Sequence, residues 1–97
     1  MIAKKHHHGK RLVLAVCDKD LLGKKFESDT MLLDLSSAFY KGEAIETAEL
    51  KELCKKAYII NAVGEKSTKM LVEIKLASPK EIKKVNDIPH IQLLIEA

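Results

Sequence analysis

Residues 10–18 read KRLVLAVCD, and this stretch decides the fold. Its side chains form two alternating sets, Leu12, Leu14 and Val16 on one face and Val13, Ala15 and Cys17 on the other. Successive side chains of a strand point to opposite faces, so both faces of this segment are apolar. A strand with two apolar faces is typical of the centre of a sheet that is covered on both sides. We therefore predict a central strand over residues 11–17.

Glycines stand on both sides of this strand. Gly9 supplies the positive φ that a tight hairpin needs, which predicts a hairpin with the short segment at residues 2–7. After the strand, Asp18 can cap one helical turn, and Gly23 can end that turn in the left-handed conformation.

The period of the apolar residues changes in the middle of the chain. Thr47 can cap a helix, and after it apolar residues fall at helical spacing up to residue 60. Asn61 interrupts this pattern, and a second apolar stripe follows. We predict two helices, at 47–60 and 62–76, that form a pair over one face of the sheet. The stripe expected in the core consists of Leu50, Leu53, Ala57, Ile60, Val63, Met70, Leu71 and Ile74.

Short apolar runs between turn residues predict the remaining strands. One pair lies at residues 26–27 and 31–36, and another lies at 82–86 and 90–95 with a bend at 87–89. Pro89 cannot donate to a strand ladder, so it should mark an edge, a bulge or a strand start.

These elements together predict an α+β fold. Residues 78–81 read SPKE, a helix-capping sequence with proline at the first position, and only a short turn follows it. The sheet should be small, mostly antiparallel and built from four or five strands, with the helix pair on one face. Residues 1–97 should form a single compact domain.

The composition is that of a globular protein, because 46% of the residues are hydrophobic and 32% are charged. The longest apolar runs are only a few residues, too short for a membrane-spanning helix. The start, MIAKKHHHGKR, lacks the apolar run of a signal peptide, so we expect a cytoplasmic protein with no membrane partner. The net charge of +3 permits an anionic partner without requiring one, since Arg11 is the only arginine.

The cysteines and histidines do not indicate a metal site or a cofactor. Cys17 and Cys54 lie far apart in sequence, and neither belongs to a CxxC pair, so we expect two small buried residues in a reducing compartment. His6 and His8 share one side of a strand and could bind a metal opportunistically. A solvated hairpin tip is the preferred interpretation, because no third ligand accompanies them.

Four motifs follow one another along the chain: LAVCDKDLLGKKF at 14–26, FYKGE at 39–43, NAVGE at 61–65 and IPHIQ at 88–92. In this order and spacing they resemble a small archaeal family, domain of unknown function four-hundred-and-twenty-four. The resemblance covers residues 2–95. It implies an archaeal cytoplasmic protein with a compact α+β fold, and it implies no particular chemistry.

The NAVGE motif lies where the second helix is predicted to begin. Free N–H groups in the first turn, with Gly64 allowing close approach and Lys66 nearby, could bind a phosphate. The structural alternative is that Asn61 caps the helix and Gly64 allows close packing on a strand. The structural alternative is favoured, because the motif lacks a glycine-rich phosphate loop.

Cys17, which carries a thiol, stands directly before the turn from Asp18 to Lys24. If the fold brought His90 within reach as a base, Cys17, Asp18 and His90 could serve a small hydrolase or transferase. Asp18 is explained more simply as a helix cap, so we assign no catalytic residue.

The IPHIQ motif places two polar side chains on one face of an otherwise apolar strand. His90 and Gln92 either line a polar groove or satisfy buried backbone groups. We predict that they form one surface with Asn61 and Gly64, or with the turn at 18–24, because loops converge at the end of a sheet.

These observations predict a non-enzymatic binding module. An RNA- or ribosome-associated accessory protein is the first hypothesis, in which Tyr40 could stack on a base or else lie buried under the helices. The alternatives are the small enzyme described above and an adaptor that binds a protein partner without nucleic acid.

Overall fold

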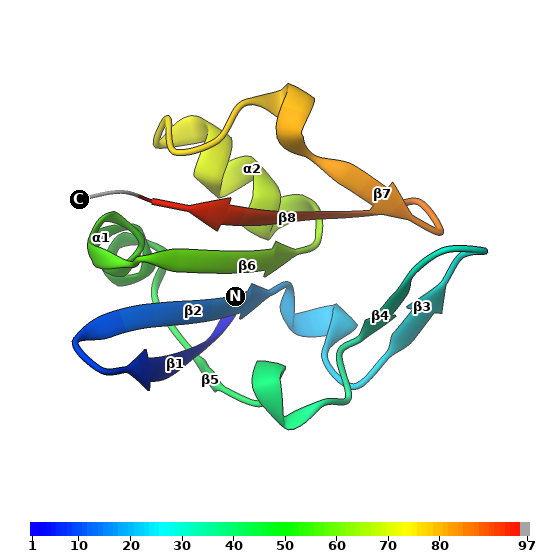
Figure 1. The fold of residues 1–97 in the computed structure, drawn as a ribbon, viewed down its shortest axis with the longest axis horizontal. Helices are drawn as coiled ribbons and strands as arrows, with labels where there is room; N and C mark the ends of the chain where they lie inside the picture. Colours follow the sequence, from blue (N-terminus) through cyan, green and yellow to red (C-terminus); the bar gives the residue numbers. More distant parts are fainter. Residues whose placement is uncertain (96–97) are drawn as a thin grey trace.

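The computed structural model describes residues 1–95. Its main element is a six-stranded sheet in the order β5-β1-β2-β6-β8-β7 (Figure 1). β2 and β6 are parallel at its centre, and the other neighbours are antiparallel. The strands are β1 (Ile2–His8), β2 (Arg11–Cys17), β5 (Glu43–Ala44), β6 (Ile59–Val63), β7 (Lys83–Val85) and β8 (Ile88–Leu94). The predicted α+β class is confirmed, with six strands in the main sheet instead of four or five.

A separate two-stranded hairpin projects from one end of the molecule (Figure 1). It consists of β3 (Lys25–Glu27) and β4 (Leu32–Asp34). The predicted strands at 26–27 and 31–36 are therefore present, but they do not join the main sheet. Three short 3-10 segments complete the irregular regions: η1 (Lys19–Leu21), η2 (Ala38–Tyr40) and η3 (Pro79–Glu81).

β2 is the central strand that its sequence predicts. It pairs with β1 on one side and with β6 on the other. Residues 14–17 are at most 1% exposed, which agrees with their two apolar faces. The hairpin between β1 and β2 turns at Gly9, whose φ of 65° is in the left-handed region that glycine adopts without strain.

Helices cover one face of the sheet. α1 (Thr47–Lys56) and α2 (Glu65–Glu73) bury apolar side chains against β2, β6 and β8 in one common core. Fully buried side chains of this core include Leu14, Leu50, Ile60 and Leu71. This packing confirms that both helices lie on the same face.

The opposite face is covered only in part. Near the ends of β2 and β6, Leu21, Leu33 and Leu35 pack on Cys17 and Val63 in a second core. Toward the other end of these strands, residues 1–95 give the sheet no such cover: Val13 and Ile59 are partly exposed, and Leu94 is 59% exposed. We call the surface formed by Val13, Ile59 and Leu94 the uncovered sheet face.

The predicted helix pair at 47–60 and 62–76 is wrong in its middle. α1 ends at Lys56, and residues 59–63 form β6, whose Ile60 and Ala62 lie in the core under the helices and whose Val63 lies in the second core. Ile60 fits a helical stripe and also fits the alternation of a strand, so periodicity alone could not separate the two. Three β-branched residues within five, Ile59, Ile60 and Val63, favour the strand.

The C-terminal hairpin also differs from the expected bent strands. β7 and β8 join through Asn86 and Asp87, both with positive φ (50° and 64°). Asparagine and aspartate tolerate this conformation better than other non-glycine residues, so the pair forms a tight turn. Pro89 is buried near the start of β8, between β6 and β7. The predicted cap at residues 78–81 is confirmed, because Ser78 and Glu81 form a capping box at η3.

Neither helix of the described residues is long and apolar enough to cross a membrane.

Candidate functional site

A pocket of about 290 Å³ lies on the sheet face opposite the helices, beside the second core. Asn61 of β6 pairs with Gln92 of β8, and Val63 pairs with His90, so the polar side chains of these strands point to the face opposite the helices. We call this cavity the sheet pocket. Its lining residues are Met31, Leu33, Tyr40, Asn61, Ala62, Val63, Lys83, His90, Ile91 and Gln92.

The sheet pocket presents hydrogen-bonding groups that the protein leaves unused. The Nε2 atom of His90 is buried without a hydrogen-bond partner among residues 1–95. Within the same residues, the side-chain amides of Asn61 and Gln92 make no hydrogen bond to the protein. Buried polar atoms are nearly always paired, so an unpaired nitrogen on a residue that lines a cavity is unusual.

The electrostatics of the sheet pocket favour a neutral imidazole. Burial lowers the pKa of His90 below its usual 6.5. The ammonium of Lys83, the residue of β7 that pairs with His90, lowers this pKa further. Burial also raises the pKa of the Tyr40 hydroxyl. Both groups therefore act near neutral pH as uncharged donors or acceptors.

We expect the lowered pKa of His90 to appear as a pH dependence of stability. The unfolded chain takes up a proton near pH 6.5, and the folded protein does so only at lower pH. This contribution to stability is therefore complete above pH 6.5 and is lost as the pH falls from there toward the lowered value. Urea unfolding at a series of pH values should show a shallower decline for His90→Gln than for the wild type. The exposed imidazole of His7 on β1 supplies the control variant, His7→Gln. An unchanged decline in His90→Gln would contradict this role.

The start of α2 is not an open anion site. The carboxylate of Asp18, only 6% exposed, accepts the backbone N–H groups of Lys66 (3.0 Å) and Ser67 (2.8 Å). It also accepts the Ser67 hydroxyl at 2.8 Å. Asp18 therefore already supplies the anion that the helix terminus favours. The expected cap of its own turn is absent, since the Asp18 side chain makes no such bond at η1.

The other predicted residues near this helix take different places. Asn61 lies within β6 and does not cap α2; Gly64 occupies the N-cap position, with φ 114°. Lys66 is exposed in the first turn, where only its backbone N–H binds Asp18. Lys24 is exposed between η1 and β3 and does not line the sheet pocket. The structure thus brings together Tyr40, Asn61, His90 and Gln92, and separately Asp18, Gly64 and Lys66.

The geometry does not supply an activated thiol. Cys17 and His90 both pair with Val63, from opposite sides. They are thus two strand spacings apart, about 10 Å, beyond hydrogen-bond reach. Burial, followed by the charge of Asp18, raises the pKa of Cys17 to about 11, so the thiol stays protonated at neutral pH. His6, the other histidine near this face, stacks on Phe39 with ring centroids 4.5 Å apart and donates to the Phe39 carbonyl oxygen at 2.9 Å.

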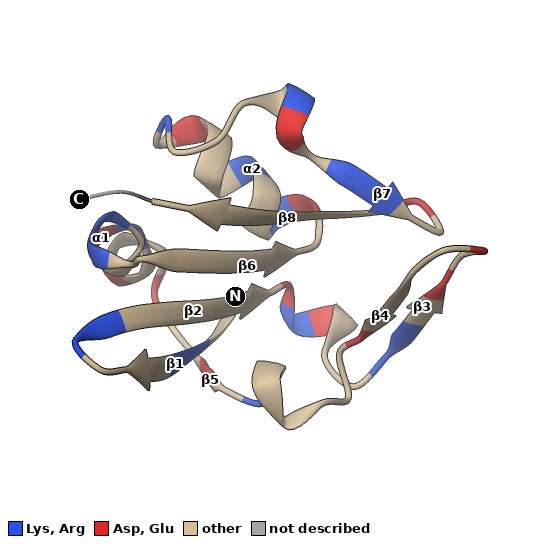
Figure 2. Cartoon of the chain, viewed as in Figure 1, with Lys and Arg blue, Asp and Glu red and all other residues tan. Residues whose placement is uncertain are grey.

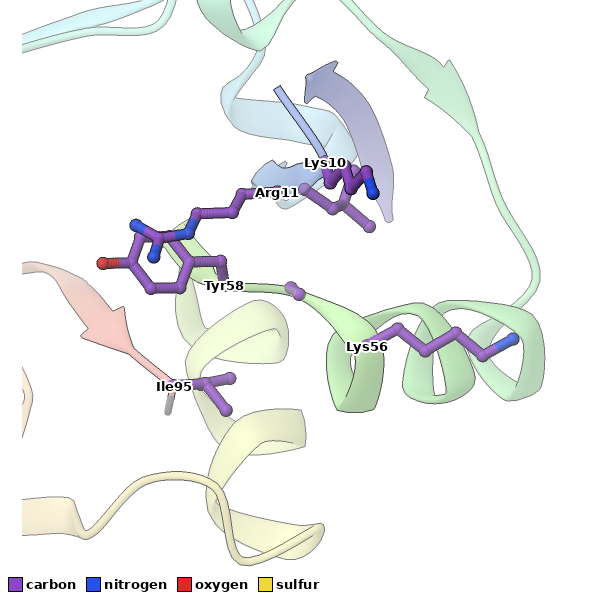
Figure 3. A pocket seen from close by; sticks show the side chains of 7 residues that line it. Lys10, Arg11, Lys56, Tyr58 and Ile95 are labelled. Carbon is purple, nitrogen blue, oxygen red and sulfur yellow. The ribbon is translucent and has the colours of Figure 1, made fainter. Parts of the chain in front are cut away.

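A second depression, of about 510 Å³, lies at the end of the sheet that carries the β1–β2 turn (Figure 3). We call it the basic end groove. Lys10, Arg11 and Lys56 are its cations, and all three are exposed. The remaining lining residues are Leu12, Ala57, Tyr58 and Ile95. In Figure 3 the Arg11 side chain reaches over the Tyr58 ring, with the guanidinium carbon 4.2 Å from the ring centroid.

Among the described residues, no ion pair neutralises the charges of the basic end groove. None of the described residues that line it is acidic. The ion pair found within residues 1–95 joins Lys55 to Glu52, outside the groove. Elsewhere on the molecule acidic and basic residues alternate around the rim of the sheet, whereas the strands at its centre carry little charge (Figure 2).

Sequence reasoning missed the basic end groove, although its signals are visible. KR at 10–11 and KKAY at 55–58 are basic doublets, the second followed by a tyrosine. They meet because β2 and β6 are parallel neighbours, and the Tyr58 N–H donates to the Leu12 carbonyl oxygen at 2.8 Å. That pairing could not be foreseen while residues 59–63 were expected to be helical.

Comparisons with known proteins agree with the family resemblance seen in the sequence. A crystal structure of an uncharacterized conserved protein from Methanopyrus kandleri is similar, with 30% sequence identity and a TM-score of 0.78. The match covers 99% of this chain and 94% of that one. No curated protein matches the chain. A family model described as "Protein of unknown function (DUF424)" matches residues 6–95. The chain therefore belongs to the DUF424 family of proteins of unknown function.

Proposed function

We propose that the protein is a non-enzymatic module that binds single-stranded RNA. It would act as an accessory protein that associates with RNA or with the ribosome. The observation that carries the proposal is the basic end groove, in which Lys10, Arg11 and Lys56 line one depression that no acidic residue among residues 1–95 lines. Phosphate contacts by lysine and arginine supply most of the affinity in non-specific nucleic-acid binding.

The three cations are not all explained by local structure. Lys56 lies in the last turn of α1, where a cation interacts favourably with the helix dipole. Lys10 and Arg11 come from the β1–β2 turn and the start of β2, so no helix end accounts for them. Arg11 is also oriented by the Tyr58 ring, which leaves its planar fork of N–H groups available for phosphate oxygens.

The neighbouring surface suits a single strand better than a duplex. The uncovered sheet face, formed by Val13, Ile59 and Leu94, lies on the side of the sheet opposite the helices and adjoins the sheet pocket along β6 and β8. Single-stranded RNA binds to such sheet surfaces because its unstacked bases can reach side chains.

A cytoplasmic location is part of the proposal. Cys17 and Cys54 are both free and buried. Free thiols are usual in the reducing compartments where RNA is translated.

We expect the triple variant Lys10→Ala/Arg11→Ala/Lys56→Ala to bind single-stranded RNA about tenfold more weakly at low salt. Loss of three phosphate contacts should also make the slope of log K against log salt concentration less negative by about 2. The measurement is fluorescence anisotropy with a mixed-sequence RNA of roughly 12 nucleotides, within the range of single-strand site sizes.

The control removes three charges elsewhere, with Lys25→Ala/Lys69→Ala/Lys80→Ala, all at exposed positions. If both triple variants lose affinity equally, the groove is not the phosphate site and only net charge matters. If the wild type does not bind RNA even at low ionic strength, the RNA proposal is overturned. The protein-adaptor alternative then remains, and the exposed Met31 and Leu32 (44% and 53%) would be its first surface to test.

A further inference from the structure

We infer that the sheet pocket binds one unstacked nucleobase, held by Asn61, His90 and Gln92. This inference deepens the proposed RNA binding and rests on it for the source of the base. The basic end groove would hold the phosphate backbone, and the sheet pocket would hold a base of the same strand.

The size of the sheet pocket fits a single ring system. Its volume of about 290 Å³ is at the lower end of small-molecule sites, which begin at roughly 300 Å³. Met31, Leu33 and Tyr40 line it from the hairpin and η2, and the polar residues of β6 and β8 line it from the sheet. A flat ligand could thus have apolar and aromatic atoms on one side and hydrogen-bonding groups on the other.

The polar groups match the edge of a base. The amides of Asn61 and Gln92 each offer both a donor and an acceptor, and they are direct partners across β6 and β8. The Nε2 atom of His90 is unpaired but buried, so it would add one more hydrogen-bonding atom only after a rotation of the ring opens it to the pocket. Asparagine and glutamine recognise bases through paired donor and acceptor atoms. A phosphate needs positive charge, and among the described residues that line the pocket Lys83 is the one lysine or arginine.

The two sites are close enough to share one strand. Tyr58 of the basic end groove and Asn61 of the sheet pocket are three residues apart along the same chain segment leading into β6. Extended chain covers about 10 Å over that interval. Because successive side chains of a strand alternate, Tyr58 and Asn61 point to opposite sides of the sheet, and a segment of RNA that contacts both sites must pass around the end of β6.

The test uses free nucleosides, which carry a base without a phosphate. Adenosine, uridine and ribose 5-phosphate are each titrated into ¹⁵N-labelled protein. The backbone amide chemical shifts are recorded by NMR at each step. We expect at least one nucleoside to shift the amides of Asn61, His90 and Gln92, and ribose 5-phosphate to leave them unchanged. Gln92→Leu should weaken nucleoside binding about tenfold. Gln92 is exposed, so this variant should fold normally. Asn61→Leu is the second variant.

The outcomes separate this inference from the proposed function. The triple variant of the basic end groove should bind nucleosides as the wild type does while binding RNA more weakly. If RNA binds in a salt-dependent manner but neither nucleoside shifts the sheet pocket, the base site is overturned and the RNA proposal stands. If nucleosides bind and RNA does not, the base site is upheld and the RNA proposal is overturned. Equal shifts with ribose 5-phosphate alone would also overturn the base site.

Discussion

The Asp18→Ala variant is expected to lose about 3–5 kcal/mol of unfolding free energy. Its carboxylate is buried and binds the N–H groups of Lys66 and Ser67 and the Ser67 hydroxyl. Alanine would leave three donors unpaired at a helix end, two of them on fully buried Ser67. Each unsatisfied buried group costs about 1–3 kcal/mol. Asp18 also connects the end of β2 to α2, elements 48 residues or more apart in sequence.

Thermal and urea unfolding measure this effect. A loss of 3 kcal/mol corresponds to a fall in Tm of roughly 12–24 °C for a domain of this size. Asp20→Ala is the matched control, because Asp20 is an exposed aspartate in the same turn and should change stability by no more than about 0.5 kcal/mol. Equal stability of Asp18→Ala and Asp20→Ala would show that the Asp18 carboxylate does not hold α2.

The Gly64→Ala variant should be destabilised by a similar amount, about 3 kcal/mol, from two sources. Gly64 has φ 114° and ψ 160°, a region almost restricted to glycine. An added Cβ would also lie 2.3 Å from the Asp18 carboxyl carbon. Gly64 cannot easily move away, since its N–H donates to the Pro89 carbonyl oxygen at 2.8 Å and its own carbonyl accepts the Thr68 hydroxyl at 2.8 Å.

Gly23→Ala separates the two sources of this cost. Gly23 also has a positive φ, 88°, but a Cβ there would meet nothing within 4 Å. The Gly23→Ala variant should lose only the unfolding free energy that the positive φ costs a residue with a Cβ, about 1–2 kcal/mol. The double variant Asp18→Ala/Gly64→Ala should lose less than the sum of the two single losses, because the clash disappears with the carboxylate. Strict additivity in urea unfolding would contradict the close contact between these residues.

Much of the fold follows from local sequence patterns. The two apolar faces of β2, the glycine turn before it and the capping box at Ser78 and Glu81 each depend on neighbouring residues, and each is confirmed. The strand at residues 59–63 was wrongly predicted as helix because the spacing of its apolar residues fits both elements. Its β-branched residues and its packing between β2 and β8 favour the strand.

The candidate site was predictable only in part, for the same reason. The sequence indicated that His90 and Gln92 share a face, which follows from strand alternation, and β8 places both on one side of the sheet. Asn61 lies beside Gln92 because β6 pairs with β8. It does not lie at the start of a helix, as was expected. Asp18 and Gly64 instead form a structural contact, and the pairing of β2 with β6 assembles the basic end groove from two distant segments.

The central claim is that RNA lies across the basic end groove and the uncovered sheet face. The most direct test is an NMR titration of the labelled wild-type protein with a short single-stranded RNA at low salt, mapped residue by residue. We predict that the perturbed amides gather around Arg11, Tyr58 and Ile59 and extend to Asn61 and Gln92, while amides on the outer side of α1 and α2 stay unchanged. Perturbations confined to the helices or to the β3–β4 hairpin, or no perturbation at all, would contradict the claim.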